Sequence, residues 1–463
     1  MITIIFMGFL LLASAVALAD WRRGWMLALV VGVLQDPARK VTPGTPIAMT
    51  FSIVLVYFII LFASHATLQR NMRDMAQRFA KVTSAAGLFF LFLIVAAING
   101  LVTYGMEFWK APALSLFIYL MPIPALILGH AFADREEVVL SYLRLYAIVT
   151  SFALIGTPLE YLNFKWQALG MVAMPEGFIR QLPGVNIRIL SGFYRAPDIM
   201  GWHAATLMMV GVTLAMKNRK LQSSWPWIFV AAWGFFNCML SGRRKAVYAT
   251  AVFAIIFVWR YARRLTTTQF VSFALIGMLL MLVVTRLSQS EESSVYTKGT
   301  AVTQAEVLQR LEGGFVDTIH QFGIMGADLG TPTQGVRHLL GHDENVGWQE
   351  GGLGKLTVEV GLPGVFAGAV LIFTLLRLLF KIASFGDEPA SSQLLRVALL
   401  SIFIANVVMF LVSAQAYSDP VLVLVSSFFL GCLLATPSFE ERSAVAVPDS
   451  GIATAALTRR ATA

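Results

Sequence analysis

Apolar stretches long enough to cross a bilayer as helices recur along almost the whole chain. A helix satisfies its backbone hydrogen bonds within itself, and about 20 apolar residues span the hydrocarbon core. The chain is 57% hydrophobic and 13% charged, whereas roughly a quarter of the residues in soluble proteins are charged. The sequence therefore predicts an all-α polytopic membrane protein with about 12–13 transmembrane helices. The thirteen stretches lie near residues 2–19, 24–36, 46–64, 84–101, 112–130, 139–157, 198–216, 225–240, 245–260, 268–285, 353–380, 393–413 and 418–436.

The first two stretches leave the count open. The stretch at 24–36 is short and ends at Asp36 and Pro37, so it is either a separate span or a half-helix that pairs with the first. The first stretch lacks a basic leader and a small-residue cleavage site. We therefore expect a retained span and not a removed signal peptide.

A long polar insert divides the chain into four parts. We expect N-terminal transmembrane helices over 1–285, an extracytoplasmic loop with short helices over 286–352, and C-terminal transmembrane helices over 353–436. The tail 437–463 is rich in Ala, Ser and Thr without an apolar period, which predicts a disordered cytoplasmic segment. Reactive polar groups need water and backbone partners, so the insert is where we expect chemistry.

The positive net charge of the chain is better explained by membrane topology and anionic lipid headgroups than by nucleic acid. A net charge of +9 would suggest nucleic acid as the partner of a soluble domain. Here Lys and Arg cluster in short loops between apolar stretches, which predicts membrane lipids as partners and no nucleic acid. The two cysteines, Cys238 and Cys432, lie in apolar runs and indicate neither a disulfide framework nor a metal site.

Basic loops orient the chain, because Lys and Arg in short loops favour the cytoplasm. The clusters at 70–81, 217–220 and 260–264 each follow an odd-numbered stretch, so all three are expected on the same side of the membrane. The segment 158–197 and the long insert are then expected to face the periplasm or the cell exterior.

One outward turn, Ser241–Lys245, breaks this rule, since Arg243, Arg244 and Lys245 are adjacent in it. Guanidinium groups at a membrane surface can grip a diphosphate with paired, charge-assisted hydrogen bonds. We predict that Arg243 and Arg244 bind a diphosphate. The alternatives are contact with lipid headgroups or a local error in the topology.

A second outward segment offers Arg188 and Arg195 as phosphate or sugar contacts. Asp198 follows a proline at a predicted helix start, where an early acidic residue is ordinary. His203 lies inside the next apolar stretch, and we predict a core histidine rather than a ligand.

The insert begins with apolar residues at three- and four-residue steps over 307–322, which predict an amphipathic helix on the membrane face with Arg310 on its polar side. The glycine-spaced loop that follows includes Gly326 and Gly330. No strand precedes this loop, so it is not a dinucleotide fingerprint. Its glycines either let backbone amides approach a substrate or make turns.

The end of the insert holds candidate general bases, namely His338, His342 and Glu350. Their spacing fits no zinc pattern, and we expect no metal and no other cofactor. Lys355 and Glu359 are four residues apart. They form either a helical ion pair at the entrance of a span, or Glu359 contributes to the site.

Several of these features together resemble the O-antigen ligase and O-antigen polymerase superfamily. They are the many spans, the outer turn Ser241-Gly-Arg-Arg244, the segment Gly192-Phe-Tyr-Arg-Ala-Pro-Asp-Ile-Met-Gly201, and the late loop from Gly323–Gly330 into Gly352–Gly364. The likeness covers most of the membrane core, and it implies an all-helical fold.

The resemblance implies a metal-independent glycosyltransferase of the bacterial inner membrane with a periplasmic active face. It would transfer a glycan from undecaprenyl diphosphate to a hydroxyl of an acceptor glycan, with inversion. Arg243 or Arg244, together with Arg195 or Arg188, would stabilise charge on the departing diphosphate. Proteins of polysaccharide export and chain-length control would be further partners.

The chain departs from the family at one place. Members commonly show a His-Asn pair where this chain reads Gly347-Trp-Gln-Glu-Gly-Gly-Leu353. Either Glu350 replaces that histidine, or His338 or His342 reaches into the site, or the chain has lost ordinary ligase chemistry.

We predict a polymerase of a secreted or surface polysaccharide, ahead of a ligase that transfers the glycan to a lipid core. A transporter or flippase of the same lipid-linked glycans is the rival from another class, and a non-catalytic scaffold is a third alternative. Transporters tend to show internal repeats and broken helices with charges at the midplane. We find no convincing half-length repeat in this sequence.

Overall fold

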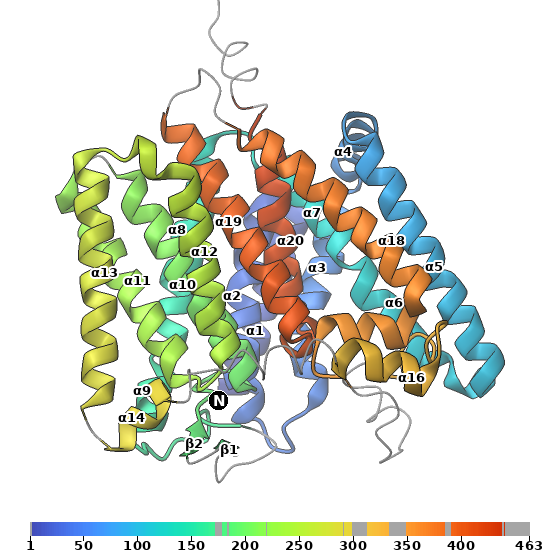
Figure 1. Ribbon diagram of the computed structural model, residues 1–463, viewed down its shortest axis with the longest axis horizontal. Coiled ribbons are helices and arrows are strands. Elements are labelled where there is room, and N and C mark those ends of the chain that lie inside the picture. The colour runs from blue at the N-terminus through green and yellow to red at the C-terminus, as the bar shows by residue number, and fades with distance from the viewer. Residues whose placement is uncertain are drawn as a thin grey trace, which may run out of the picture.

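The computed structural model describes residues 2–171, 178–182, 185–218, 220–289, 291–298, 313–332, 349–384, 390–437 and 439, and helices account for most of them (Figure 1). Each of the thirteen predicted stretches is helical, so the all-α fold class is confirmed and the chain is a multi-pass membrane protein. The elements of the first half are α1 (Ile2–Ala19), α2 (Trp21–Lys40), η1 (Ile47–Phe51), α3 (Ser52–Ala63), α4 (His65–Arg78), α5 (Ala80–Tyr104), η2 (Met106–Trp109), α6 (Lys110–Leu120), α7 (Pro122–Phe132), α8 (Glu136–Ala153), α9 (Gly156–Tyr161), β1 (Phe178–Leu182) and β2 (Val185–Ile189).

The second half continues the bundle and ends near its centre (Figure 1). Its elements are α10 (Pro197–Lys217), α11 (Leu221–Leu240), α12 (Arg244–Tyr261), η3 (Ala262–Arg264), α13 (Thr267–Ser288), α14 (Glu291–Lys298), η4 (Gly313–Asp317), α16 (Thr318–Phe322), α18 (Gly352–Ile382), α19 (Ala390–Val412), η5 (Gln415–Ser418) and α20 (Pro420–Ala435).

Within the described residues, nine helical segments are long and apolar enough to cross a membrane. A tenth span forms if the segments on either side of the 80° bend between α3 and α4 are counted as one. The predicted number was 12–13, and the three helices α2, α11 and α20 account for the difference. They fall short because α20 has only 16 residues and because α2 and α11 carry polar side chains. All three pack against other helices, so their polar groups find protein partners.

Helix α2 differs from its prediction at its end. We expected a stop at Asp36 and Pro37, but the helix continues through Pro37 to Lys40. Proline lacks a backbone N–H donor and often ends a helix, but Pro37 lies inside α2 and does not end it. The extension places Asp36 and Lys40 on the last two turns, both of them buried.

Helix α10 lies at the centre of the bundle and is buried over its whole length except for Lys217. It packs against α8, α11, α12 and α19. Gly211 and Gly234 let α10 and α11 approach, since a Cβ at Gly211 would lie 2.7 Å from the Ala231 nitrogen. The rigid surroundings of α10 fix the position of the residues at its N-terminus.

A short antiparallel hairpin of β1 and β2 was not predicted. It lies at the lower end of the molecule in Figure 1, with α9, α14 and α16, whereas α4 lies at the upper end. Helix α12 runs from the lower end to the upper one, so the Ser241–Lys245 turn and the basic η3 are at opposite ends.

Helix α18 was predicted as one straight span, but it is broken at Gly361, which has φ 62°. A break in a helix frees backbone groups that need new partners. The loop after α16 supplies them: Ala327 N donates to Val358 O at 2.7 Å, and Leu362 N donates to Ile324 O at 2.8 Å. The glycine-spaced loop therefore stabilises the kink of α18 through hydrogen bonds on both sides of Gly361.

Replacement of Gly326 with Ala should destabilise the protein. Gly326 has φ 82°, and a Cβ there would lie 2.5 Å from the Val358 oxygen. We expect a loss on the order of 2–3 kcal/mol, from left-handed strain plus the steric clash, measured as a lower unfolding midpoint in detergent. The matched control is Gly323→Ala, which has φ 76° but open space around its Cβ. Equal losses in the two variants would contradict the proposed clash.

Candidate functional site

The Ser241–Lys245 turn is held in place by local contacts. Helix α11 ends at Leu240, and Gly242 adopts φ 61°, a left-handed conformation that glycine tolerates. The backbone N–H of Arg243 donates to Ser241 Oγ at 3.1 Å. A Cβ at Gly242 would lie 3.2 Å from Ile187 Cγ2 on β2. The turn thus packs on the hairpin, and this packing helps to fix the backbone at Arg243.

Asp198 connects this turn to the start of α10. Its carboxylate pairs with Arg243 Nη2 at 2.8 Å and also with the ammonium of Lys245. Lys245 in turn donates to Ser413 Oγ at 2.5 Å. We had interpreted Asp198 as an ordinary acidic residue of a helix start. It does occupy the first turn of α10, and it is also the anion that orients Arg243.

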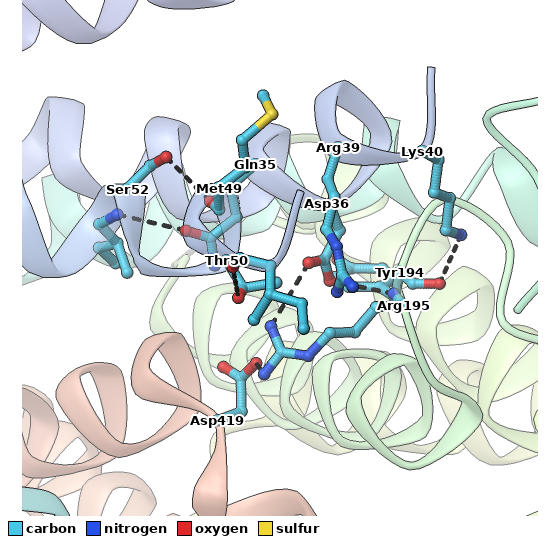
Figure 2. Close-up of polar contacts among 12 residues, drawn as sticks. Gln35, Asp36, Arg39, Lys40, Met49, Thr50, Ser52, Tyr194, Arg195 and Asp419 are labelled. Atoms are coloured by element: carbon cyan, nitrogen blue, oxygen red, sulfur yellow. Dashed lines mark hydrogen bonds and ion pairs between the residues drawn. The ribbon is translucent and has the colours of Figure 1, made fainter. Parts of the chain in front are cut away.

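Arg195 lies between two carboxylates from distant parts of the chain (Figure 2). Its Nη1 is 3.4 Å from Asp36 Oδ1, and its Nη2 is 2.5 Å from Asp419 Oδ2. The backbone N–H of Arg195 also donates to Asp36 Oδ2 at 3.0 Å. Burial alone would lower the pKa of Arg195, but the charges of Asp419 and Asp36 outweigh burial and raise the pKa. The guanidinium therefore stays charged and joins α2, α10 and α20.

The backbone just before Arg195 is clamped by two further buried charges. Lys40 Nζ donates to Gly192 O at 2.9 Å and to Tyr194 O at 2.6 Å. Glu160 Oε2 accepts from the N–H groups of Ser191 and Gly192 at 2.9 and 2.6 Å. These bonds satisfy backbone groups that would otherwise be buried without partners. They give the segment in front of α10 a single conformation.

The segment from Ser413 to Asp419, here called the 413–419 loop, meets both clusters. Its first residue bonds to Lys245 and its last residue pairs with Arg195. The N–H of Ala414 donates to Glu350 O at 3.0 Å, and the charge of Glu350 acts on Lys245. Glu350 therefore lies on the same side of the bundle as the arginine turn, with a half-buried side chain.

The structure brings together Arg195, Arg243 and Glu350 through their shared neighbours, but it directs Arg188 elsewhere. Residues alternate between the two faces of a strand, so Ile187 and Ile189 face Gly242 while Arg188 faces away from it. Its Nη1 donates to the side chain of Asn163. Its backbone carbonyl accepts from Tyr296 Oη at 2.7 Å.

The remaining predicted site residues lie apart from one another in the chain, and three of them fall outside the described residues. Arg244 is buried in the first turn of α12. Gly326 braces the α18 kink, and Gly330 packs against Ala111, whose carbonyl carbon would lie 2.6 Å from an added Cβ. Glu359 is fully buried in α18 and accepts a hydrogen bond from Tyr119. Arg310, His338 and His342 lie outside the described residues.

The sequence singles out Asp419 beside Pro420 as the best candidate for a charge within a span, but the pairing of Asp36 and Asp419 with Arg195 was not predicted. Asp36 and Asp419 each stand directly before a proline at one boundary of an apolar stretch, Asp36 at the end of 24–36 and Asp419 at the start of 418–436. Acidic residues at such positions near a membrane span need a partner. His203, by contrast, is a core histidine as predicted: it is buried, lies 3.1 Å from Tyr146 Oη and stacks on Tyr194.

Arg243 Nε is one of several buried polar atoms around this site without a hydrogen-bond partner, together with Ser191 Oγ and Tyr194 Oη. Arg243 has 15% of its side chain exposed, and its Nε is buried without a hydrogen-bond partner. A buried N–H without a partner costs free energy, commonly about 1–3 kcal/mol. The guanidinium is paired with Asp198 on one side and stays partly exposed, so a phosphate or diphosphate oxygen that approaches the exposed part can accept from its remaining donors.

A scan against models of protein families found no match, and a search of curated proteins found none either.

Proposed function

We propose that this protein is a polymerase of a secreted or surface polysaccharide in a bacterial inner membrane. It transfers a glycan from undecaprenyl diphosphate to the hydroxyl of an acceptor glycan. The observation that carries the proposal is Arg243, a partly exposed guanidinium at the end of a helical bundle that is oriented by a carboxylate. Asp198 orients this guanidinium but does not exhaust its five N–H donors.

In this mechanism the cations act on the leaving group. Negative charge grows on the diphosphate as its bond to the anomeric carbon breaks, and preorganised donors lower the free energy of that transition state. Arg243 contacts the diphosphate, with Arg244 beside it in the turn. Arg195 is already held by two carboxylates, so we assign it the positioning of the α10 start rather than a direct contact.

Glu350 is the base in this proposal. It would take the proton of the acceptor hydroxyl as the oxygen attacks the anomeric carbon on the face opposite the diphosphate, which gives inversion. Its position beside Lys245 and the 413–419 loop supports this role. The histidines His338 and His342 remain alternative bases.

A Glu350→Gln variant tests this assignment. Glutamine keeps the shape of the side chain and one acceptor oxygen, but its NH₂ group replaces the second oxygen and the amide does not accept the proton. We expect the rate of glycan transfer to fall about 10²–10⁴-fold, as is typical for the loss of a general base, while the purified protein keeps its unfolding midpoint. Full activity of Glu350→Gln would exclude this base, and the same change at Glu107, which lies on η2, serves as the control.

The function itself is tested with purified protein in detergent and a synthetic diphosphate-linked oligosaccharide. Lengthening of the oligosaccharide with release of the lipid diphosphate supports a polymerase. Transfer only to an added lipid-core acceptor supports a ligase of the same chemistry. Mild acid release of the glycan confirms that the lipid-linked substrate is intact. If neither product then forms, both the polymerase and the ligase are contradicted.

A transporter of lipid-linked glycans is the second candidate, and two observations favour it. Helix α18 is broken at Gly361, and the Asp36–Arg195–Asp419 ion pairs join separate helices, as in transporters that rock around broken helices. Reconstitution in liposomes separates the candidates. A transporter moves a fluorescent glycolipid between leaflets without changing its mass, whereas a polymerase changes the mass.

A further inference from the structure

A pocket of about 200 Å³ is lined in part by Tyr417 of the 413–419 loop, the segment whose last residue pairs with Arg195. It is smaller than the roughly 300–1,000 Å³ typical of pockets for drug-sized ligands, so it suits a single ring. Most of its wall is apolar. Its lining residues come from α6, α7, α18, α19, η5 and α20 and include Tyr119, Lys355, Tyr417 and Ser426.

A buried ammonium group lines this pocket. Lys355 is only 7% exposed, and its Nζ is 3.9 Å from Glu359 Oε1, at the outer limit of an ion pair. The ammonium also lies 5.5 Å from the centre of the Tyr119 ring. An ammonium has three donors, and a single carboxylate at that distance leaves donor capacity for a ligand.

Ser426 of α20 lines the same pocket, and its hydroxyl has no hydrogen-bond partner. Ser426 Oγ is buried and forms no hydrogen bond. Serine in a helix commonly bonds to the carbonyl four residues earlier, as Ser401 does to Val397 O at 2.7 Å. Buried polar atoms in native proteins are nearly always satisfied. The unsatisfied Ser426 is a second, independent sign that this pocket receives a polar ligand.

The charges around the pocket decide which polar ligand fits. Glu359 is close to Lys355, so a phosphate or carboxylate that approached the ammonium would also be repelled by Glu359. A neutral sugar ring avoids this repulsion. Its hydroxyls accept from Lys355, donate to or accept from Ser426, and its apolar faces pack on Tyr119 and Tyr417.

We propose that this pocket binds one neutral sugar ring, the terminal residue of the acceptor glycan. The second half of this statement rests on the proposed function, whereas the binding of a sugar ring does not. The 413–419 loop connects the two sites, since Tyr417 lines the pocket and Asp419, two residues later, pairs with Arg195. Tyr417 is fixed in this loop because its Oη donates to Asn406 O at 2.7 Å.

The binding test uses octyl β-glucoside with a photoreactive diazirine in its alkyl chain, applied to the full-length protein in a glycoside-free detergent. We expect light-dependent labelling of peptides that contain residues 118–122 or 410–427, and competition by free hexoses. In Ser426→Ala the hexose concentration that halves labelling should rise about threefold to tenfold. Lys355→Met should raise it at least as much. The control Ser401→Ala, whose hydroxyl is bonded outside the pocket, should leave it unchanged.

Three outcomes would overturn the sugar site. They are competition by inorganic phosphate instead of hexoses, labelling that only a plain alkyl detergent displaces, and equal hexose competition in Ser426→Ala and the unaltered protein. Labelling does not require transfer activity, so it separates the two proposals. If labelling behaves as expected but no oligosaccharide is lengthened, the polymerase is wrong and the sugar site stands. If lengthening occurs, Ser426→Ala should raise the KM for acceptor and leave that for donor unchanged.

Discussion

Replacement of Arg243 with Gln will abolish polymer formation and leave the protein folded in the membrane. The Arg243 side chain places a partly exposed guanidinium at the Ser241–Lys245 turn, and Asp198 orients it. Loss of one preorganised donor to a transition-state anion commonly costs about 10²–10³-fold in rate. Loss of the positive charge adds to this cost. We expect the transfer rate to fall at least 10²-fold, measured as release of lipid diphosphate.

The protein should tolerate this change because Asp198 keeps Lys245 as its partner, so no buried carboxylate is left without a counter-charge. The matched control is Arg263→Gln, which removes the same charge from an exposed position in η3. Unchanged polymer length and yield in Arg243→Gln would rule out the diphosphate role. So would labelling of an Arg243→Cys variant from the cytoplasmic side by an impermeant maleimide, since native Cys238 and Cys432 are both buried.

Replacement of Arg195 with Met should cause the largest loss of stability. The substitution removes the cation that Asp36 and Asp419 share; these carboxylates are 3% and 2% exposed, and Asp36 keeps the charges of Arg39 and Lys40 nearby. Removal of one partner from a buried ion pair typically costs about 3–5 kcal/mol, because the remaining charge is buried without compensation. We expect a correspondingly lower unfolding midpoint in detergent, with Met chosen to preserve the apolar bulk of the side chain.

Two variants show whether the cost comes from charge. The exposed pair of Arg23 with Asp20 provides the matched control, and Arg23→Met should cost at most about 1 kcal/mol. The triple variant Arg195→Met, Asp36→Asn, Asp419→Asn removes the uncompensated carboxylates and should recover most of the loss. A single Arg195→Met that is as stable as Arg23→Met would contradict the structural role of these ion pairs.

Local sequence signals pointed to the Ser241–Lys245 turn but not to the contacts around it. The turn with Arg243 was found because it breaks the distribution of basic residues, and the turn indeed lies at the opposite end of α12 from η3. The break of α18 had a signal in Gly361, Pro363 and Gly364, which we had attributed to a family motif rather than to a kink. The direction of Arg188 had no such signal, since it depends on an unpredicted hairpin.

The apolar stretches by themselves determined that this chain is an all-helical, multi-pass membrane protein. The reason is local: a backbone in lipid has to bond within its own segment, and the length of each apolar stretch can be counted. Only the tertiary structure decided how the charges are paired. Arg195 and Asp36 are 159 residues apart, and their contact depends on how α2, α10 and α20 pack. Because pairing of buried charges is a property of that packing, no spacing along the chain encodes it.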